Sequence, residues 1–318
     1  MNESESFDST TIANVAPTRN SSLDHLGLIV VQGTDAAAFL DAQLTNNVAV
    51  GAAADDARLS GYCSPKGRLL ATFVQWTDGE NYFLQTSRDI IETVLKRLRM
   101  FVLRSKVTLA DASDSFVQYG LIDASEADGK QVWGMTRGSD RWSIRFPDAD
   151  GARRTLLIVK RNADPQHEAA SSPVDASLWR WGEIRAGLPR ITAQTQDRFV
   201  PQMINFEALG GVDFKKGCFP GQEVVARSQY RGKLKRRMAL ATGVAKDIAA
   251  APGIDVFVAS DDSQACGRVV NAEHGPNGEL ALLIELPLAL FASDALRLAT
   301  ANGPALRIDP LPYSLPDN

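Results

Sequence analysis

The order of the elements that the sequence predicts constrains the fold of this chain more than any other feature. Short apolar runs typical of strands occupy residues 28–31, 58–63, 68–76 and 82–84. An amphipathic helix over 91–102 follows them, and strand-like runs return over 107–160. Strands and helices that do not alternate regularly are typical of α+β proteins rather than of doubly wound parallel sheets. The sequence therefore predicts an α+β fold.

The second half of the chain has a different pattern. A polar stretch at 161–174 predicts a linker or exposed loop, and Asp175 then caps a helix that ends at Ala186, before Gly187. Beyond Arg237, brief apolar runs are separated by Gly, Pro and Asn. Regularly spaced short strands of this kind predict a small β-barrel or sandwich.

Length and composition exclude only the extreme classes of protein. The chain has 318 residues, 44% of them apolar and 23% charged, which is typical of a globular protein of about two or three domains. Its three cysteines, Cys63, Cys218 and Cys266, include no CxxC pair, so neither a disulfide framework nor a four-cysteine zinc site is expected. The polar N-terminus and the lack of a long apolar run predict neither a signal peptide nor a membrane span. We expect a cytoplasmic protein.

The densest charge lies between Phe214 and Arg237. This basic strip holds eight Lys or Arg residues against the single acid Glu223, a net charge of +7 in a chain whose overall charge is −4. A cationic strip on an acidic protein favours an anionic ligand such as phosphate, polyglutamate or nucleic acid. Charge runs are also common on solvated helix faces, so the strip alone leaves both interpretations open.

Within the strip, the segment KGCFPGQE places Cys218 between Gly217 and Gly221. Glycines let the backbone approach another group closely. A thiol just before a helix N-terminus and beside lysines gains nucleophilicity, because both features favour the thiolate. A lone cysteine is also often a small buried hydrophobe. The residues alone leave the role of Cys218 open between reactive and structural.

The helix after Asp175 carries a tryptophan away from its apolar stripe. Trp179 projects to the side opposite the stripe, so either a neighbouring domain covers it or it offers a flat face to a planar ligand such as a pterin. Glu183 follows at i+4 and is placed to accept hydrogen bonds from a ligand's amino groups. The stripe itself consists of Leu178, Trp181, Ile184 and Leu188.

The histidines point to no catalytic or metal site. His25, His167 and His274 stand in or near polar stretches without a partner at metal-ligand spacing. We therefore expect neither a histidine-based zinc site nor Ser/His/Asp catalysis.

The stretch Gly187–Arg227, GLPRITAQTQDRFVPQMINFEALGGVDFKKGCFPGQEVVAR, closely resembles the signature of the YgfZ-type folate-binding proteins. These are relatives of the glycine-cleavage T-protein, an aminomethyltransferase. Weaker likeness extends over nearly everything after residue 22. The resemblance implies interleaved α+β subdomains around a central folate channel over 22–236 and a C-terminal β-barrel over 237–318, preceded by a disordered N-terminus at 1–21.

The resemblance also implies a site for tetrahydrofolate or a derivative. Trp179 matches a tryptophan that such proteins place against the folate, and Leu26 stands where the family has its other folate-contacting tryptophan. Glu183 joins them as the acceptor predicted from the helix, and Cys218 is the candidate reactive thiol. The motif positions expected at the folate site are Lys216, Gly217, Gly221, Gln222, Glu223 and Arg227.

One departure argues against aminomethyltransferase activity. The acidic pair that the T-protein carries after its Lys-Gly turn is replaced here by Ala71 and Thr72. General acid–base or electrostatic help is typically worth about 10² to 10⁴ in rate, so its loss makes that reaction improbable.

We therefore expect a folate-binding accessory protein that supports iron–sulfur enzymes and, indirectly, tRNA modification such as methylthiolation. The alternatives are a folate-dependent one-carbon transferase and a protein that binds tRNA directly through the strip at 227–237. Reduced folate and iron–sulfur enzymes or assembly proteins are the expected partners, and no membrane partner is expected.

Overall fold

The computed structural model of this chain describes residues 19–48, 56–123, 129–163, 172–230, 234–244, 250–259, 261–275 and 278–316. The N-terminal segment predicted to be disordered therefore lies outside the described residues up to residue 18. Its last residues, 19–21, belong to strand β1, which pairs with β7 and β11.

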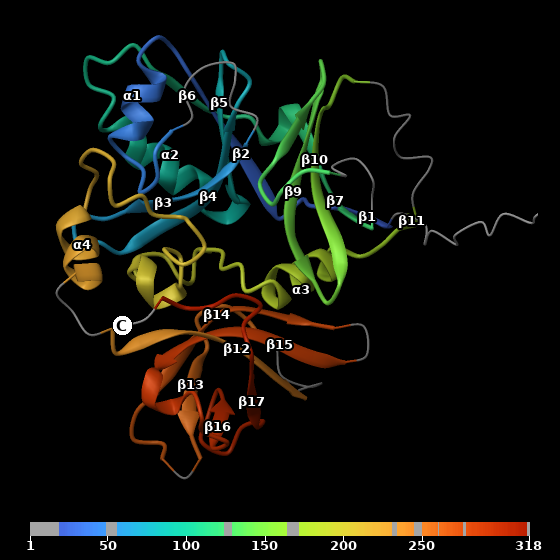
Figure 1. Cartoon of the computed structure of the whole chain (residues 1–318), viewed down its shortest axis with the longest axis vertical. Helices are drawn as coiled ribbons and strands as arrows, with labels where there is room; N and C mark the ends of the chain where they lie inside the picture. The colour runs from blue at the N-terminus through green and yellow to red at the C-terminus, as the bar shows by residue number, and fades with distance from the viewer. Residues whose placement is uncertain are drawn as a thin grey trace, which may run out of the picture.

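A five-stranded antiparallel sheet forms the first lobe, with strand order β3-β4-β5-β2-β6 (Figure 1). The predicted hairpin is present, because Ser64–Gly67 provides a tight turn between two apolar runs. The strands are β2 (Leu26–Gln32), β3 (Arg58–Cys63), β4 (Leu69–Thr77), β5 (Tyr82–Ser87) and β6 (Thr108–Asp111). The helices of this lobe are α1 (Ala36–Asp41), the 3₁₀ turn η1 (Arg88–Ile90) and α2 (Ile91–Arg99).

A six-stranded sheet forms the second lobe, with strand order β11-β1-β7-β10-β9-β8. The 3₁₀ turn η2 (Ser113–Ser115) leads into it from β6. Its strands are β1 (Arg19–Ser22), β7 (Phe116–Ile122), β8 (Met135–Arg137), β9 (Arg141–Ala149), β10 (Ala152–Lys160) and β11 (Ser172–Pro173). Because β1 belongs to this sheet while β2 to β6 belong to the other, the two lobes are interleaved along the chain, as the resemblance implies.

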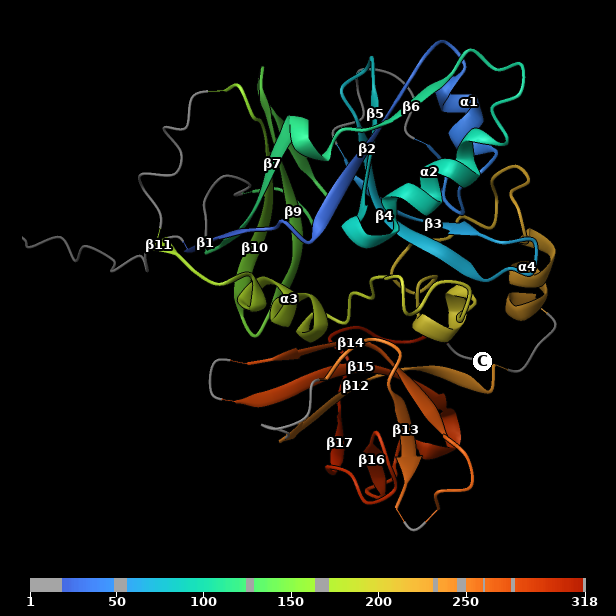
Figure 2. The ribbon, with the colours of Figure 1, turned by 180° about the vertical axis from the view of Figure 1, so that it is seen from behind.

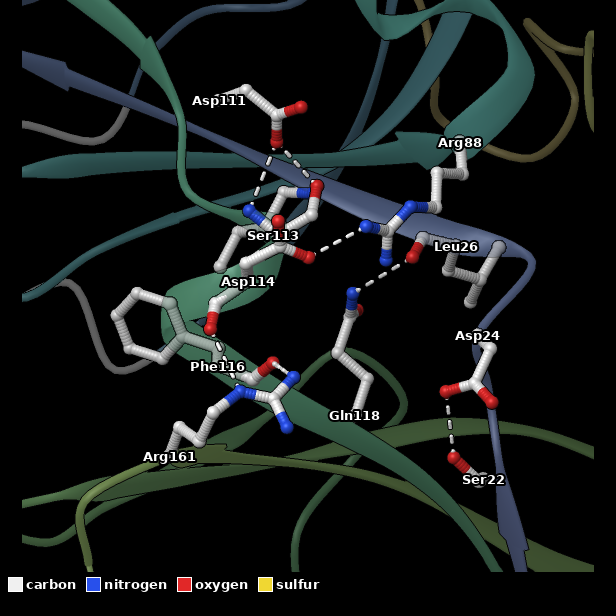
Figure 3. A network of polar contacts seen from close by, with 11 residues as sticks. Ser22, Asp24, Leu26, Arg88, Asp111, Ser113, Asp114, Phe116, Gln118 and Arg161 are labelled. Carbon is white, nitrogen blue, oxygen red and sulfur yellow. Dashed lines mark hydrogen bonds and ion pairs between the residues drawn. The ribbon is translucent and has the colours of Figure 1, made fainter.

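Polar contacts join the two lobes where the chain passes from one to the other (Figure 3). Gln118 of β7 donates to the carbonyl of Leu26 in β2 at 3.3 Å and also accepts from Gln85 of β5 at 2.7 Å. Arg88, the first residue of η1, pairs with Asp114 of η2 at 2.6 Å. The bond from Gln118 holds Leu26, the first residue of β2, against the second sheet.

The C-terminal lobe is a six-stranded sheet with order β16-β13-β14-β15-β12-β17. A bridge between Arg297 and Ala305 brings its first and last strands together, so the sheet closes into a barrel, as predicted. The strands are β12 (Arg236–Val244), β13 (Asp255–Val258), β14 (Gly267–His274), β15 (Glu279–Pro287), β16 (Leu296–Leu298) and β17 (Leu306–Asp309). The 3₁₀ turn η5 (Leu288–Leu290) follows β15, and β17 was not anticipated from the sequence.

Helix α3 (Ala176–Arg185) lies between the second sheet and the barrel in both views (Figures 1 and 2). The predicted cap is present, because the Asp175 carboxylate accepts from the amide of Ser177 at 2.7 Å. After α3, an extended connector runs to the 3₁₀ turn η4 (Pro201–Ile204), and α4 (Gln222–Tyr230) follows. The main hydrophobic core is continuous across both sheets, α3 and the outer face of the barrel, while a second core fills the barrel.

Candidate functional site

A cavity of about 430 Å³ lies where the first lobe, α3, the connector after α3 and the barrel meet. This size is within the usual range of about 300–1,000 Å³ for small-molecule sites. Apolar side chains cover part of its wall, and charged side chains converge on the rest. The lining consists of His25, Ser87, Arg88, Asp89, Arg180, Glu183, Ile184, Leu188, Arg190, Thr192, Pro252, Asn271 and Ala272.

Glu183 and Arg190 form a buried ion pair at the centre of this wall. Burial raises the pKa of the Glu183 carboxyl, but the guanidinium of Arg190, with help from Arg154 and His25, outweighs it and brings the pKa below its usual value. Glu183 is therefore ionised at neutral pH. The Nε of Arg190 lies buried without a hydrogen-bond partner in the described chain.

His25 faces the same cavity from the loop before β2. Burial lowers its pKa to about 4, and the cations Arg190 and Arg180 add to this while Glu183 opposes it. The ring is therefore neutral at pH 7. Its Nε2 lies buried without a hydrogen-bond partner among the described residues. A buried polar atom without a partner has a desolvation cost that a ligand can relieve.

The barrel completes the site through β14. Asn271 accepts from the amide of Arg190 at 2.9 Å and donates to the carbonyl of the same residue at 3.0 Å. Arg180 of α3 pairs with Glu273 of β14. These contacts hold the connector and α3 against the barrel, so the cavity has a fixed wall on each side.

Trp179 does not line this cavity, and the prediction of a face open to a pterin is wrong. Its ring is fully buried against the second sheet, where a Cβ on Gly120 would lie 2.3 Å from it and Phe146 lies beside it. The guanidinium of Arg154 covers the ring, with its carbon 4.1 Å from the ring centroid. Of the two alternatives that the sequence left open, the structure has the one in which a neighbouring sheet covers the indole.

Leu26 is also buried in the core and is not among the residues that line the cavity. Among the predicted site residues, only Glu183 lines the cavity.

The KGCFPGQE segment at 216–223 lies elsewhere, against the β3–β4 turn, with α4 and α3 on different sides of the molecule in both views (Figures 1 and 2). Gly221 has φ +77°, and a Cβ there would lie 2.4 Å from the carbonyl oxygen of Ser64. The side chain of Lys216 is buried and pairs with Asp41 at 3.6 Å. Both residues hold the segment in place, so Gly221 and Lys216 have structural roles that do not depend on a ligand.

The remaining signature residues are more accessible. Cys218 and Gly217 are exposed at the surface, as are Glu223 and Arg227. Gln222 donates to the carbonyl of Gly217 at 3.4 Å, closing the loop around Cys218. The exposed thiol rules out the role of small buried hydrophobe for this cysteine.

The basic strip is not one continuous cationic face. Lys216 pairs with Asp41, Arg236 with Glu285, and the buried Arg237 with Glu207 at 2.7 Å. Arg231 and Lys233 lie outside the described residues. A charge count along the sequence overestimates the free charge here, because the neutralising acids come from distant segments.

The sequence reasoning missed His25 and Arg190. His25 gave no signal, because most of the residues that share its cavity wall come from distant segments: α3, the connector and the barrel. Arg190 lies within the signature stretch, and its position seven residues after Glu183, past the end of the helix, hides the pairing.

The two residues that replace the acidic pair of the T-protein lie in β4. Ala71 is buried, and the hydroxyl of Thr72 accepts from the amide of Ile191 at 3.1 Å.

No group of three or more potential metal ligands occurs among the described residues. Within the same part of the chain, no helix is long and apolar enough to cross a membrane.

No family model matches the sequence. The tRNA-modifying protein YgfZ of Vibrio vulnificus (strain YJ016) is 31% identical over 305 residues, which cover 93% of each chain. The protein of the same name from Vibrio atlanticus (strain LGP32) is 29% identical, over 96% of this chain and 98% of its own length.

Among solved structures, the glycine cleavage system aminomethyltransferase T from Bartonella henselae matches with a TM-score of 0.67. The match covers 94% of this chain and 87% of that one, at 14% sequence identity, and shows that the two share a fold. The Vibrio protein that is 31% identical over 93% of each chain identifies the family. This chain belongs to the YgfZ family.

Proposed function

We propose that this protein binds a reduced folate in the Glu183 cavity and thereby takes part in tRNA modification. The observation that carries the proposal is a cavity lined by Glu183, His25 and Arg190, in which the Glu183 carboxylate is buried and Nε2 of His25 and Nε of Arg190 are buried without a partner. Buried polar groups without partners are rare in proteins, and their convergence in a cavity is typical of a ligand site.

The residues present fit a reduced pterin. A pterin ring carries an amino group and a ring N–H that donate, and Glu183 supplies an ionised acceptor. Its carbonyl and ring nitrogens accept, and Arg190 supplies a donor. Ile184, Leu188 and Pro252 offer apolar surface to the faces of the ring. Trp179 has no part in this arrangement.

The wider role rests on the family. The Vibrio relatives are named as tRNA-modifying proteins. The resemblance of the signature implies a second role, which is to assist iron–sulfur enzymes, including those that methylthiolate tRNA. We infer that folate binding serves such enzymes in this protein as well. Loss of the gene should then lower methylthiolated tRNA in the source organism, and the parent chain, but not Glu183→Gln, should restore it.

Titration calorimetry with tetrahydrofolate under anaerobic conditions tests the binding itself. Glu183→Gln should weaken the affinity about tenfold or more, because a hydrogen bond to a charged group is worth about 1.5–3 kcal/mol. His25→Gln, which changes the same wall and leaves the ion pair intact, should weaken it as well.

Glu80→Gln is the matched control, since Glu80 is exposed on the β4–β5 turn. Thermal denaturation of each variant separates lost binding from lost folding. No heat of binding up to millimolar tetrahydrofolate, or equal affinity of folded Glu183→Gln and the parent, contradicts the proposal.

A further inference from the structure

A second cavity, of about 210 Å³, lies farther along the same seam between the connector and the barrel. Four arginines and two acids line it: Arg68, Arg198, Arg236, Arg268, Asp255 and Glu285. They come from the β3–β4 turn, the connector, β12, β14, β13 and β15, so the cluster forms only when the barrel docks on the first lobe.

Two of these arginines have an acidic partner. Arg236 pairs with Glu285, and Arg268 pairs with Asp255 at 2.7 Å. The charges of both carboxylates in the cavity are thereby neutralised by these two arginines.

The other two arginines leave an excess positive charge. Arg68 donates to the carbonyl oxygen of Arg198 at 2.8 Å, which fixes its guanidinium without neutralising it. The side chain of Arg198 has no ion pair or hydrogen bond within the described ranges. A guanidinium carries five donors in a planar fork, so both residues keep free donors for an oxyanion such as a carboxylate.

The register of β14 brings this cluster close to the Glu183 cavity. Arg268 pairs with Glu285 and Asn271 with Leu283, because a bulge at Val270 inserts one extra residue. Residues 283 and 285 of β15 share a face, so Arg268 and Asn271 share the outer face of β14. Asn271 lines the first cavity and Arg268 the second, and three residues of strand span roughly 10 Å.

The connector and the β13 loop touch between the two cavities. A Cβ on Gly253 would lie 3.3 Å from Cβ of Gln194. Gln194 is exposed, so a ligand that reaches both cavities crosses this contact on its solvent side. Such a ligand needs a ring at one end and a flexible anionic chain at the other.

We propose that Arg68 and Arg198, backed by Arg236 and Arg268, bind the carboxylates of an oligoglutamyl tail on the folate whose ring lies in the Glu183 cavity. This rests on the proposed folate binding and adds a preference for the polyglutamylated form. The extra carboxylates of the longer tail meet two guanidiniums that lack an acidic partner.

Calorimetry with monoglutamyl and triglutamyl tetrahydrofolate tests the inference. The triglutamate should bind about tenfold or more tightly than the monoglutamate, and raised salt should reduce that advantage. Arg198→Ala and Arg68→Ala should each reduce the advantage while leaving monoglutamate affinity unchanged. Arg141→Ala, an exposed arginine at the start of β9, is the control and should leave both affinities unchanged.

Equal affinity for the two forms, or an advantage that survives in the Arg68→Ala/Arg198→Ala double variant, overturns the tail site and leaves folate binding standing. Binding of neither form overturns both proposals. Free triglutamate should compete with the triglutamyl ligand in the parent and lose that effect in the double variant.

Discussion

At the scale of single residues, the charge state of the cavity wall depends on His25. The pKa of this ring falls from an ordinary 6.5 to about 4, chiefly through burial. Between these pH values the unfolded chain binds a proton that the folded chain does not, so acid favours unfolding. Lowering the pH from 7 to 5 should cost about 2 kcal/mol of unfolding free energy through this group alone.

Urea denaturation of the parent and of His25→Gln at pH 7 and pH 5 checks this. The variant should lose less stability over this interval, because glutamine does not titrate. Glu183 acts at lower pH, since its pKa is depressed and its stabilisation is lost only as the carboxyl is protonated. A parallel pH dependence in the two proteins would show that His25 is not the titrating group.

Cys218 and Cys63 should differ sharply in reactivity. Cys218 is exposed, whereas Cys63 is fully buried and burial raises the pKa of its thiol. Brief treatment of the folded protein with iodoacetamide should label Cys218 and spare Cys63, as read by mass spectrometry of peptides. Denaturant should expose Cys63 to labelling, and Cys218→Ser should remove the fast phase.

At the scale of elements, the signature loop is attached to the β3–β4 turn through a glycine contact. Gly221→Ala places a methyl group against the Ser64 carbonyl at a residue with φ +77°. Left-handed backbone costs about 1–2 kcal/mol for a residue with a Cβ, and crowding adds about 1–3 kcal/mol. The variant should therefore unfold at clearly lower temperature in a calorimetric scan.

Gly217→Ala is the control within the same motif. A Cβ at this position would meet only the Asp41 carboxylate, at 4.0 Å. The variant should therefore have nearly the same melting temperature as the parent. Equal losses in the two variants would mean that the loop is held by something other than this close approach.

Helix α3 shows which features of an element the sequence can predict. Its cap at Asp175 and its end before Gly187 follow from local hydrogen bonding and were predicted correctly. Its orientation was not, because the helical-wheel argument assumes one buried face. Here a sheet covers Trp179 and the barrel covers Trp181 through Gly275, so both faces are occupied. Only tertiary packing determines which tryptophan is fully buried.

At the scale of the whole molecule, a buried ion pair attaches the barrel to the rest. Arg237 of β12 pairs with Glu207 at 2.7 Å, and both side chains are almost inaccessible. Removing one partner of such a pair leaves an uncompensated charge and costs about 3–5 kcal/mol. Glu207→Ala should therefore lower the midpoint of urea denaturation strongly.

The double variant Glu207→Leu/Arg237→Met tests whether the unpaired buried charge causes this loss of stability. It removes both charges and keeps apolar volume, so it should recover much of the stability that Glu207→Ala loses. A double variant as unstable as the single one would assign the loss to packing and not to the unpaired arginine.

The strands were largely predictable, and the site was not. Apolar runs such as 58–63 and 280–286 became strands because their side chains are buried in the sheets. β17 was missed because only Leu306 and Ile308 in it are apolar. The cavity joins His25, Glu183 and Asn271, which are brought together only where the loop before β2, α3 and the barrel pack against one another.

The interleaving of the two lobes has a consequence for synthesis on the ribosome. All strands of the five-stranded sheet lie between Leu26 and Asp111, so that sheet can assemble while the remainder of the chain is still being translated. β1 leaves the exit tunnel first, yet its partners, Ile122 in β7 and Ser172 in β11, emerge much later. The earliest of the described strands is therefore among the last to find its neighbours, and until then its unpaired backbone is a target for chaperones.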